Sequence, residues 1–466
     1  MKIQKILLGV LSLLLTTSCN DFLSLTPISE ASSANYYKNA TDIESAISGC
    51  YASLQDNNLY GQKMIALTEL RSDNIEDINP GANAGMYYFI DKFTLTSGNE
   101  VIRDVWKASY NLIYRCNNVI ANLDVVDNPL LKKQYEGEAS FLRAMTYFNI
   151  VRLWGAAPLI LEPIDAKDAV NYGRTPVSEI YAAIEEDLKN AMGKLEATYD
   201  DNSLGRATCV SAGALLGKVY ITQQKWTDAV TLLDEIIQTY SSQYGLLENV
   251  NDIFSVDNEM NKEILFAVRW SKTITGEGQK SYNDYFRDDK TLIDTNLKNA
   301  YEASDTRKTL IEYKRVDANN NVLTKYYDTF DASNSTVGYD IPLLRWADVL
   351  LMASEAHNEL KFEGNDDSKA MIYLNKVRNR AGATEYTSES LTSQELFRKA
   401  IYEERRLELP FEMHRWFDLI RTDTGIEEMK KVGITITKND YLYPIPKTEV
   451  DLVNDINKFP QNPGYN

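Results

Sequence analysis

Histidine and basic residues are scarce in this sequence, and both shortages narrow what the protein can do. The 466 residues include only two histidines, His357 and His414, which leaves little for histidine-based catalysis or histidine-ligated metal sites. Asp and Glu outnumber Lys and Arg by 67 to 49, so the formal charge is −18. A chain this acidic is a poor partner for phosphate backbones and anionic lipid headgroups. We therefore expect no nucleic-acid partner.

The sequence also lacks hydrophobic runs long enough to span a membrane, and its one clear apolar run is short and lies near the start. A cationic stretch at 1–5 precedes an apolar stretch at 6–15, which is shorter than the roughly 20 residues that span a bilayer. A small residue, Ser18, stands directly before Cys19, as in bacterial lipoprotein signals. We predict a signal peptide at 1–18, cleavage before Cys19, and lipidation of that cysteine, which would hold the body (19–466) at a membrane. An ordinary secretory signal is the alternative.

Cysteine is rare as well, with four in the chain. If Cys19 carries lipid, Cys50, Cys116 and Cys209 remain. Three is an odd number and no two of them are close in sequence, so we expect buried thiols rather than a disulfide framework or a CxxC metal or redox site. The motifs G-x-S-x-G and H-E-x-x-H are also absent. We expect a protein that is not an enzyme and that has no metal site.

Helical periodicity is what the sequence has in abundance, mostly in pairs of segments. The clearest pair spans 208–240, where apolar residues recur at helical spacing on both sides of a break at 223–225, as in a tetratricopeptide unit. Further helices are predicted at 41–54, 101–123, 130–153, 176–195, 346–360, 368–380 and 392–409. We predict a mainly α fold, a tetratricopeptide-like scaffold of about four helix pairs at about 39–240 and 345–420.

Two irregular, loop-rich segments interrupt this scaffold, at about 60–99 and 241–344. The second carries a few strand-like runs, among them 264–268, 313–316 and 322–327. The turn at 317–321 has Asp317, Asn319 and Asn321 at calcium-loop spacing, but Val322 replaces the required glycine and Asp328 the final glutamate. We expect a simple turn and no cofactor, with calcium as the open alternative.

An ordered set of motifs resembles the SusD/RagB family of outer-membrane lipoproteins from Bacteroidota-type bacteria. No single motif is specific enough to indicate this family, but the order of the motifs over almost the full length is. The earlier motifs are CNDFL at 19–23, GCY at 49–51, ELRSD at 69–73, FLRA at 141–144 and RLWG at 152–155. The more specific later ones are LRWAD at 344–348, NKVRNRAG at 375–382, EERRLE at 403–408, HRWFDL at 414–419, YPIP at 443–446 and QNPGY at 461–465.

This resemblance implies a helical scaffold with an irregular ligand-binding half, in a lipid-anchored protein exposed at the cell surface of the outer membrane. It implies that the protein captures an oligosaccharide or polysaccharide and delivers it to a SusC-like TonB-dependent transporter. A branch of the family handles peptides, so a RagB-like peptide-binding protein stays open. A protein-interaction scaffold without a small ligand stays open too.

Aromatic and polar side chains in the two irregular segments are the candidate ligand contacts. Sugar rings present apolar C–H faces rimmed by hydroxyls, which suit aromatic rings beside Asn, Asp and Arg on loops held by a rigid scaffold. The candidates are Asp73, Asn74, Tyr87 and Tyr88 in the first segment, and Trp270, Tyr282, Tyr285 and Arg287 in the second. Tyr outnumbers Phe by 29 to 14, and the tyrosines on helix faces are predicted to pack: Tyr110, Tyr114, Tyr147 and Tyr220.

A charge-dense stretch at 403–418 requires a separate explanation. Its paired carboxylates could serve an unrecognised glycoside hydrolase. However, arginines are interleaved at helical neighbour distances, and they would keep the carboxylates ionised rather than raise the pKa of one of them. We predict a structural salt-bridge network here, formed by Glu403, Glu404, Arg405, Arg406, Glu408, Glu412, Arg415 and Asp418.

Overall fold

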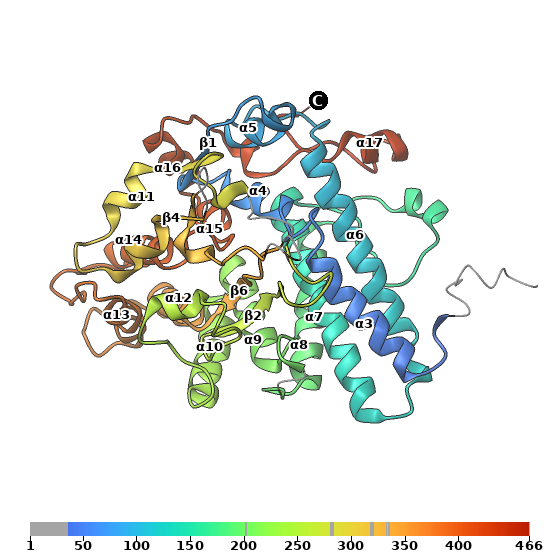
Figure 1. The fold of residues 1–466 in the computed structure, drawn as a ribbon, viewed down its shortest axis with the longest axis horizontal. Helices are drawn as coiled ribbons and strands as arrows, with labels where there is room; N and C mark the ends of the chain where they lie inside the picture. Colours follow the sequence, from blue (N-terminus) through green and yellow to red (C-terminus); the bar gives the residue numbers. More distant parts are fainter. Residues whose placement is uncertain are drawn as a thin grey trace, which may run out of the picture.

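The computed structural model describes residues 36–200, 203–279, 284–316, 321–331, 333 and 336–465. Within them the chain is mainly α-helical with a few short strands, which confirms the predicted fold class (Figure 1). The predicted signal peptide (1–18), Cys19 and the candidate Tyr282 lie outside the described residues. No described helix is both long and apolar enough to cross a membrane.

Helices packed side by side form the scaffold. In chain order they are α3 (Ala40–Leu54), α6 (Glu100–Ala121), α7 (Pro129–Trp154), α8 (Val177–Lys194), α9 (Cys209–Thr222), α10 (Trp226–Tyr240), α12 (Trp346–Leu360), α13 (Lys369–Ala381) and α14 (Gln394–Glu408). From α6 to α10 each helix packs on the next, and α10 then packs on α12, which contacts α13 and α14. Figure 1 shows this row crossing the molecule, with α3 and α6 at one side and α13 at the other. Such stacking is the arrangement of helix-pair repeats.

Two glycines let α9 and α10 approach closely. A Cβ atom added to Gly217 would lie 2.5 Å from a side-chain carbon of Leu233, and one added to Gly213 would lie 2.8 Å from a side-chain carbon of Ile236. Since real Cβ atoms do not come this near to other atoms, a larger residue at either position would force Leu233 or Ile236 to shift. The predicted helix–turn–helix therefore depends on these two small residues.

The described cysteines are free thiols in this scaffold. Cys50 on α3 and Cys116 on α6 are buried, as predicted, whereas Cys209 at the start of α9 is half-buried. Burial raises the pKa of the Cys116 thiol well above its usual value. A thiol in such a setting is unreactive, because the thiolate is the reactive form.

The irregular segments contain more regular structure than the sequence suggested. The first holds α4 (Lys63–Glu69), β1 (Ile75–Asp77) and α5 (Met86–Asp91). The second holds β2 (Ile264–Val268), β3 (Thr291–Ile293), α11 (Thr295–Ala300), β4 (Tyr313–Arg315), β5 (Asn321–Leu323) and β6 (Ile341–Arg345). After α14 follow α15 (Arg415–Arg421), α16 (Gly425–Lys431) and α17 (Lys447–Val453).

The strands form antiparallel pairs. β4 and β5, which correspond to the strand-like runs on either side of the predicted turn at 317–321, pair with each other, and β2 pairs with β6. β1 pairs with β3, with Ile75 opposite Ile293 and Glu76 opposite Leu292. This last pairing, which the sequence did not indicate, joins the two irregular segments to each other.

The predicted ion-pair network around 403–418 is present, but most of its partners come from other segments, and it ties the second irregular segment to α14. Arg345 at the end of β6 lies 2.6 Å from the Glu412 carboxylate, 2.7 Å from that of Glu263 and 3.0 Å from that of Glu408. Burial alone would raise the pKa of the Glu408 carboxyl, but neighbouring arginines, Arg345 among them, hold it well below its usual range. Glu408 is therefore a structural anion and does not have the raised pKa of a glycosidase acid.

Candidate functional site

The pairing of β1 with β3 places α5 beside the second irregular segment. The rings of Tyr87 on α5 and Tyr285, just before β3, meet edge to face with centroids 5.4 Å apart. Tyr87 is 7% exposed and Tyr285 1% exposed. These two candidates are thus brought together by the fold, but as a packed joint beneath the surface.

Above the contact between Tyr87 and Tyr285 lies a small surface that combines aromatic, aliphatic and charged side chains. We call it the α5 platform, and it consists of Glu76, Tyr88, Phe89, Lys92 and Leu292. Glu76 and Leu292 are opposite each other across β1 and β3, and both are exposed. The Lys92 Nζ atom lies 2.6 Å from Glu76 Oε1 and 5.6 Å from the ring centroid of Tyr88. Phe89 is 44% exposed and its ring lies 6.3 Å from that of Tyr88. Rings beside a hydrogen-bonding ion pair suit a sugar, which offers both C–H faces and hydroxyls.

The loop that leads into α5 has an unusual backbone. Asn83, Ala84 and Gly85 have successive φ values of 50°, 54° and 75°. For residues with a side chain, such left-handed conformations cost about 1–3 kcal/mol each and tend to occur at functional sites. A Cβ atom on Gly85 would lie 3.1 Å from the Phe89 ring. This loop therefore sets the position of Phe89 on the platform.

Asp73 and Asn74 lie within the protein, where arginines bind them. Both Asp73 carboxylate oxygens accept hydrogen bonds from Arg415, at 2.7 and 2.8 Å, and Arg406 donates to Asn74 Oδ1 at 2.9 Å. Burial alone would raise the pKa of Asp73, but Arg415 and Arg406 hold it below its usual value. These contacts tie the first irregular segment to α14 and α15. A ligand role for this pair stays a prediction, and it would require a sugar to displace an arginine.

Trp270 and Arg287 lie elsewhere in the second segment. Trp270, 5% exposed, follows β2, and its backbone N–H donates to Asp340 at 2.9 Å. Burial, with a contribution from Glu259, raises the pKa of Asp340 to about 7. Arg287 is half-buried and donates to both carboxylate oxygens of Asp289 at 2.9 Å. Among the described candidates, only Tyr88 and Arg287 keep appreciable side-chain surface accessible.

The sequence interpretation missed four members of the α5 platform: Glu76, Phe89, Lys92 and Leu292. A signal for Phe89 did exist, because Tyr87, Ile90 and Asp91 are buried at helical spacing and so turn Tyr88 and Phe89 outward. That signal required the short helix α5 to be recognised first. Leu292 could not be found in this way, since only the pairing of β3 with β1 brings it to this surface.

The described side chains of the turn compared above with a calcium loop form hydrogen bonds with other protein groups. Asn321 donates to the Asp288 carboxylate at 2.6 Å, and the Asp328 carboxylate accepts from Lys272 and from the backbone of Gly338. Asp317 and Asn319 lie outside the described residues. The described part of the chain has no group of three His, Cys, Asp or Glu side chains placed to hold a metal ion.

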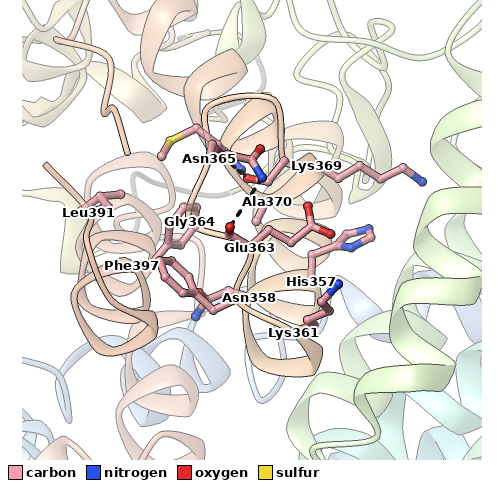
Figure 2. Close-up of a pocket in the computed structure, with 13 residues that line it drawn as sticks. His357, Asn358, Lys361, Glu363, Gly364, Asn365, Lys369, Ala370, Leu391 and Phe397 are labelled. Atoms are coloured by element: carbon pink, nitrogen blue, oxygen red, sulfur yellow. Dashed lines mark hydrogen bonds between the residues drawn. The ribbon is translucent and has the colours of Figure 1, made fainter. Parts of the chain in front are cut away.

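A cavity between α12, α13 and α14 is too small for a sugar. Figure 2 shows it lined by His357, Lys369 and Phe397, among others, and its volume is about 20 Å³. That is room for about one water molecule. His357 and Lys369 are in any case engaged, since both lie within 3.0 Å of the Asp234 carboxylate on α10.

Comparisons with known proteins find members of one family that match nearly the whole chain. A family model described as the SusD family matches residues 222–465, and one described as "Starch-binding associating with outer membrane" matches 21–221. SusD-like protein P25 and SusD-like protein P2 of Formosa agariphila are each 29% identical to this chain; the alignment covers 90% of both chains for P25 and 100% of both for P2. A solved structure described as a laminarin binding SusD-like protein is 25% identical, with a TM-score of 0.75, over 92% of this chain and 100% of that one.

Proposed function

The chain belongs to the SusD family, and on that basis we propose that it is a non-enzymatic, cell-surface glycan-binding protein that delivers oligosaccharide or polysaccharide to a SusC-like TonB-dependent transporter. The α5 platform is the observation that carries the binding part of this proposal. It combines an exposed Phe89 ring, the adjacent Tyr88 ring and the Lys92–Glu76 ion pair, next to the strained loop that leads into α5. The laminarin-binding relative supports a glycan as the ligand class.

The location at the outer membrane rests on two further observations. The family model that matches 21–221 is described as associating with the outer membrane. The sequence places Cys19 after an apolar stretch of lipoprotein type. We propose that Cys19 carries lipid and anchors the protein at the cell surface. Labelling with radioactive palmitate should mark the wild-type protein and not a Cys19→Ala variant, and label retained in the variant would contradict the anchor.

Native gels cast with a panel of polysaccharides test the binding proposal. Laminarin, starch, xylan and galactomannan form a suitable panel, and at least one should retard the wild-type protein. Phe89→Ala should weaken that retardation while leaving the unfolding midpoint unchanged, because the Phe89 ring is 44% exposed. Binding of peptides with no retardation by any polysaccharide would favour the RagB-like alternative.

A further inference from the structure

A groove lies along α6, and none of the residues that line it belongs to the α5 platform. Trp106, Tyr110 and Tyr114 follow one another at four-residue spacing and therefore share one face of this helix. Two adjoining cavities of about 470 and 690 Å³ lie over that face. Both are lined by Tyr114, Ile164 and Asp165, so they form one continuous groove, which we call the α6 groove. Residues of α17, among them Leu452 and Val453, also line it; Figure 1 shows this helix at the upper right.

The aromatic floor of the α6 groove is held in place by its neighbours. Trp106 is 3% exposed and its ring lies 5.1 Å from that of Tyr110. The Tyr110 hydroxyl donates to the Pro158 carbonyl at 2.8 Å, which fixes the orientation of the ring. From Trp106 to Tyr114 the stripe runs about 12 Å along the helix axis. Because Trp106 is buried, it supports the Tyr110 ring from within, and the accessible part of the stripe consists of Tyr110 and Tyr114.

Tyr114 is the exposed end of this stripe. Its helix-face position predicted a packing role, yet it is 45% exposed. An exposed tyrosine ring at the meeting point of two cavities is placed to contact a ligand in either of them. The packing prediction for Tyr114 was therefore wrong, because α6 turns this face toward the groove and no other helix covers it in the described structure.

The charged side chains that line the groove indicate which ligand charge it favours. The larger cavity is lined by Glu162, Asp165 and Asp168, and no Lys or Arg is among the described residues that line it. The smaller cavity adds one cation, Lys107, and one carboxylate, Glu449. Outside both linings, Lys167 lies 3.4 Å from the Asp165 carboxylate. This excess of carboxylates repels an anionic ligand. A purely apolar ligand is also disfavoured, because it would strip water from the carboxylates that line the groove without replacing their hydrogen bonds.

We propose that the α6 groove is a second ligand site, for an uncharged oligosaccharide segment. Such a segment offers C–H faces to the tyrosine stripe and hydroxyl donors to the carboxylates at the rim. The inference rests on the proposed glycan-binding function and adds a second contact to it. Two sites on one rigid body bind a long polysaccharide by avidity, since the second contact becomes intramolecular once the first has formed.

Affinity measurements on single and double variants test the groove. The probe is the polysaccharide, among laminarin, starch, xylan and galactomannan, that retards the wild-type protein most. Tyr114→Ala and Phe89→Ala should each weaken binding roughly three- to tenfold, as expected for the loss of one stacking ring. In the double variant, the fold-loss of affinity should equal or exceed the product of the fold-losses in the two single variants. Leu396→Ala, at an equally exposed position (44%) on α14, is the matched control and should bind like the wild type.

The outcomes separate failure of the groove from failure of the function. Wild-type affinity in Tyr114→Ala, with weakened binding in Phe89→Ala, would overturn the α6 groove and leave the glycan-binding function intact. Weakened binding in Tyr114→Ala alone would support the groove and contradict the α5 platform. No retardation by any of the four polysaccharides, with Tyr114-dependent binding of a lysine- and leucine-rich peptide, would overturn both the function and the saccharide groove.

Discussion

The ring of Tyr87 meets the ring of Tyr285 edge to face, with the centroids 5.4 Å apart and the ring planes at 87°. This contact lies where the two irregular segments join, directly beneath the surface that carries Tyr88 and Phe89. Because β1 and β3 are only three residues long, side-chain packing of this kind must supply much of the stability of the joint.

Tyr285→Ala should therefore loosen the joint. Removal of this buried ring is expected to lower the free energy of unfolding by about 3–5 kcal/mol, because it leaves a cavity against Tyr87. Urea denaturation measures the loss. Tyr88→Ala, on the exposed side of the same helix, should cost far less while still weakening glycan binding. A loss of stability in Tyr285→Ala as small as that expected for Tyr88→Ala would contradict a structural role for Tyr285.

The Asp73–Arg415 pair should be a strong structural contact. Asp73→Ala leaves a buried guanidinium without its carboxylate and should destabilise the protein by about 3–5 kcal/mol. The exposed Lys447–Asp451 pair, at a similar distance of 2.7 Å, is the matched control, and Asp451→Ala should cost less than about 1 kcal/mol. Chemical denaturation at pH 7 compares the two.

The pH dependence of that contribution has a definite sign. The folded-state pKa of Asp73 is lowered, so the stability it contributes is present above its unfolded pKa of about 3.9 and is lost as the pH falls through the lower folded value. The difference in stability between wild type and Asp73→Ala should shrink in acid. A difference that stays constant from pH 7 to pH 3 would contradict the assignment.

The contribution of Glu69 to stability should have the opposite pH dependence to that of Asp73. Burial raises the pKa of its carboxyl from 4.5 to about 7, although the backbone N–H of Met413 donates to it. The folded state thus binds this proton more tightly than the unfolded state does. Its contribution is full below about pH 4.5 and declines as the pH rises toward 7, by roughly 3 kcal/mol in all.

Glu69→Gln should remove this dependence. Glutamine keeps an acceptor for the Met413 N–H and does not ionise, so the variant should gain stability relative to wild type between pH 5 and pH 8. Urea denaturation at both pH values measures the change. Glu76→Gln serves as the exposed control and should show no such gain; parallel pH profiles for wild type and Glu69→Gln would refute the expectation.

Gly217→Ala tests the close packing of α9 on α10. The added Cβ would lie 2.5 Å from a Leu233 side-chain carbon, and this overpacking should cost about 1–3 kcal/mol. Gly193, on α8, is a matched control, because a Cβ there meets nothing within 4 Å. Gly193→Ala should be neutral or stabilising by up to about 1 kcal/mol, through its better helix propensity. Thermal or chemical unfolding of the two variants gives the comparison.

The scaffold could be predicted from the sequence because the information that specifies a helix is local. Apolar residues at helical spacing indicated α9 and α10, where the inward faces are set by neighbours three and four residues apart. The prediction of a structural ion-pair network for 403–418 was correct, but its local reason holds for few of the pairs: Arg405 pairs with Asp418 within the stretch, whereas most of the other charges pair with distant segments. Its partners, such as Arg345 and Asp73, were not visible in that stretch.

The candidate site could be placed only in part. The proposed α5 platform draws on both irregular segments, but Tyr88 is the one candidate from the sequence that belongs to it. A tyrosine in a loop-like sequence can point inward, as Tyr285 does, or outward, as Tyr88 does, and composition alone does not distinguish the two. Only the short helix α5 and the β1–β3 pairing fix those directions.

By itself, the sequence determined the helical scaffold, its pairing into repeats, the acidic charge that disfavours nucleic acid, and the predicted lipid signal before Cys19. The tertiary structure alone decided that Ile75 lies opposite Ile293, that Arg415 takes Asp73 out of the candidate surface, and that Tyr114 opens onto a groove. The physical reason is separation along the chain. Helices follow from contacts within a few residues, whereas these arrangements depend on pairings between segments hundreds of residues apart, which no local pattern records.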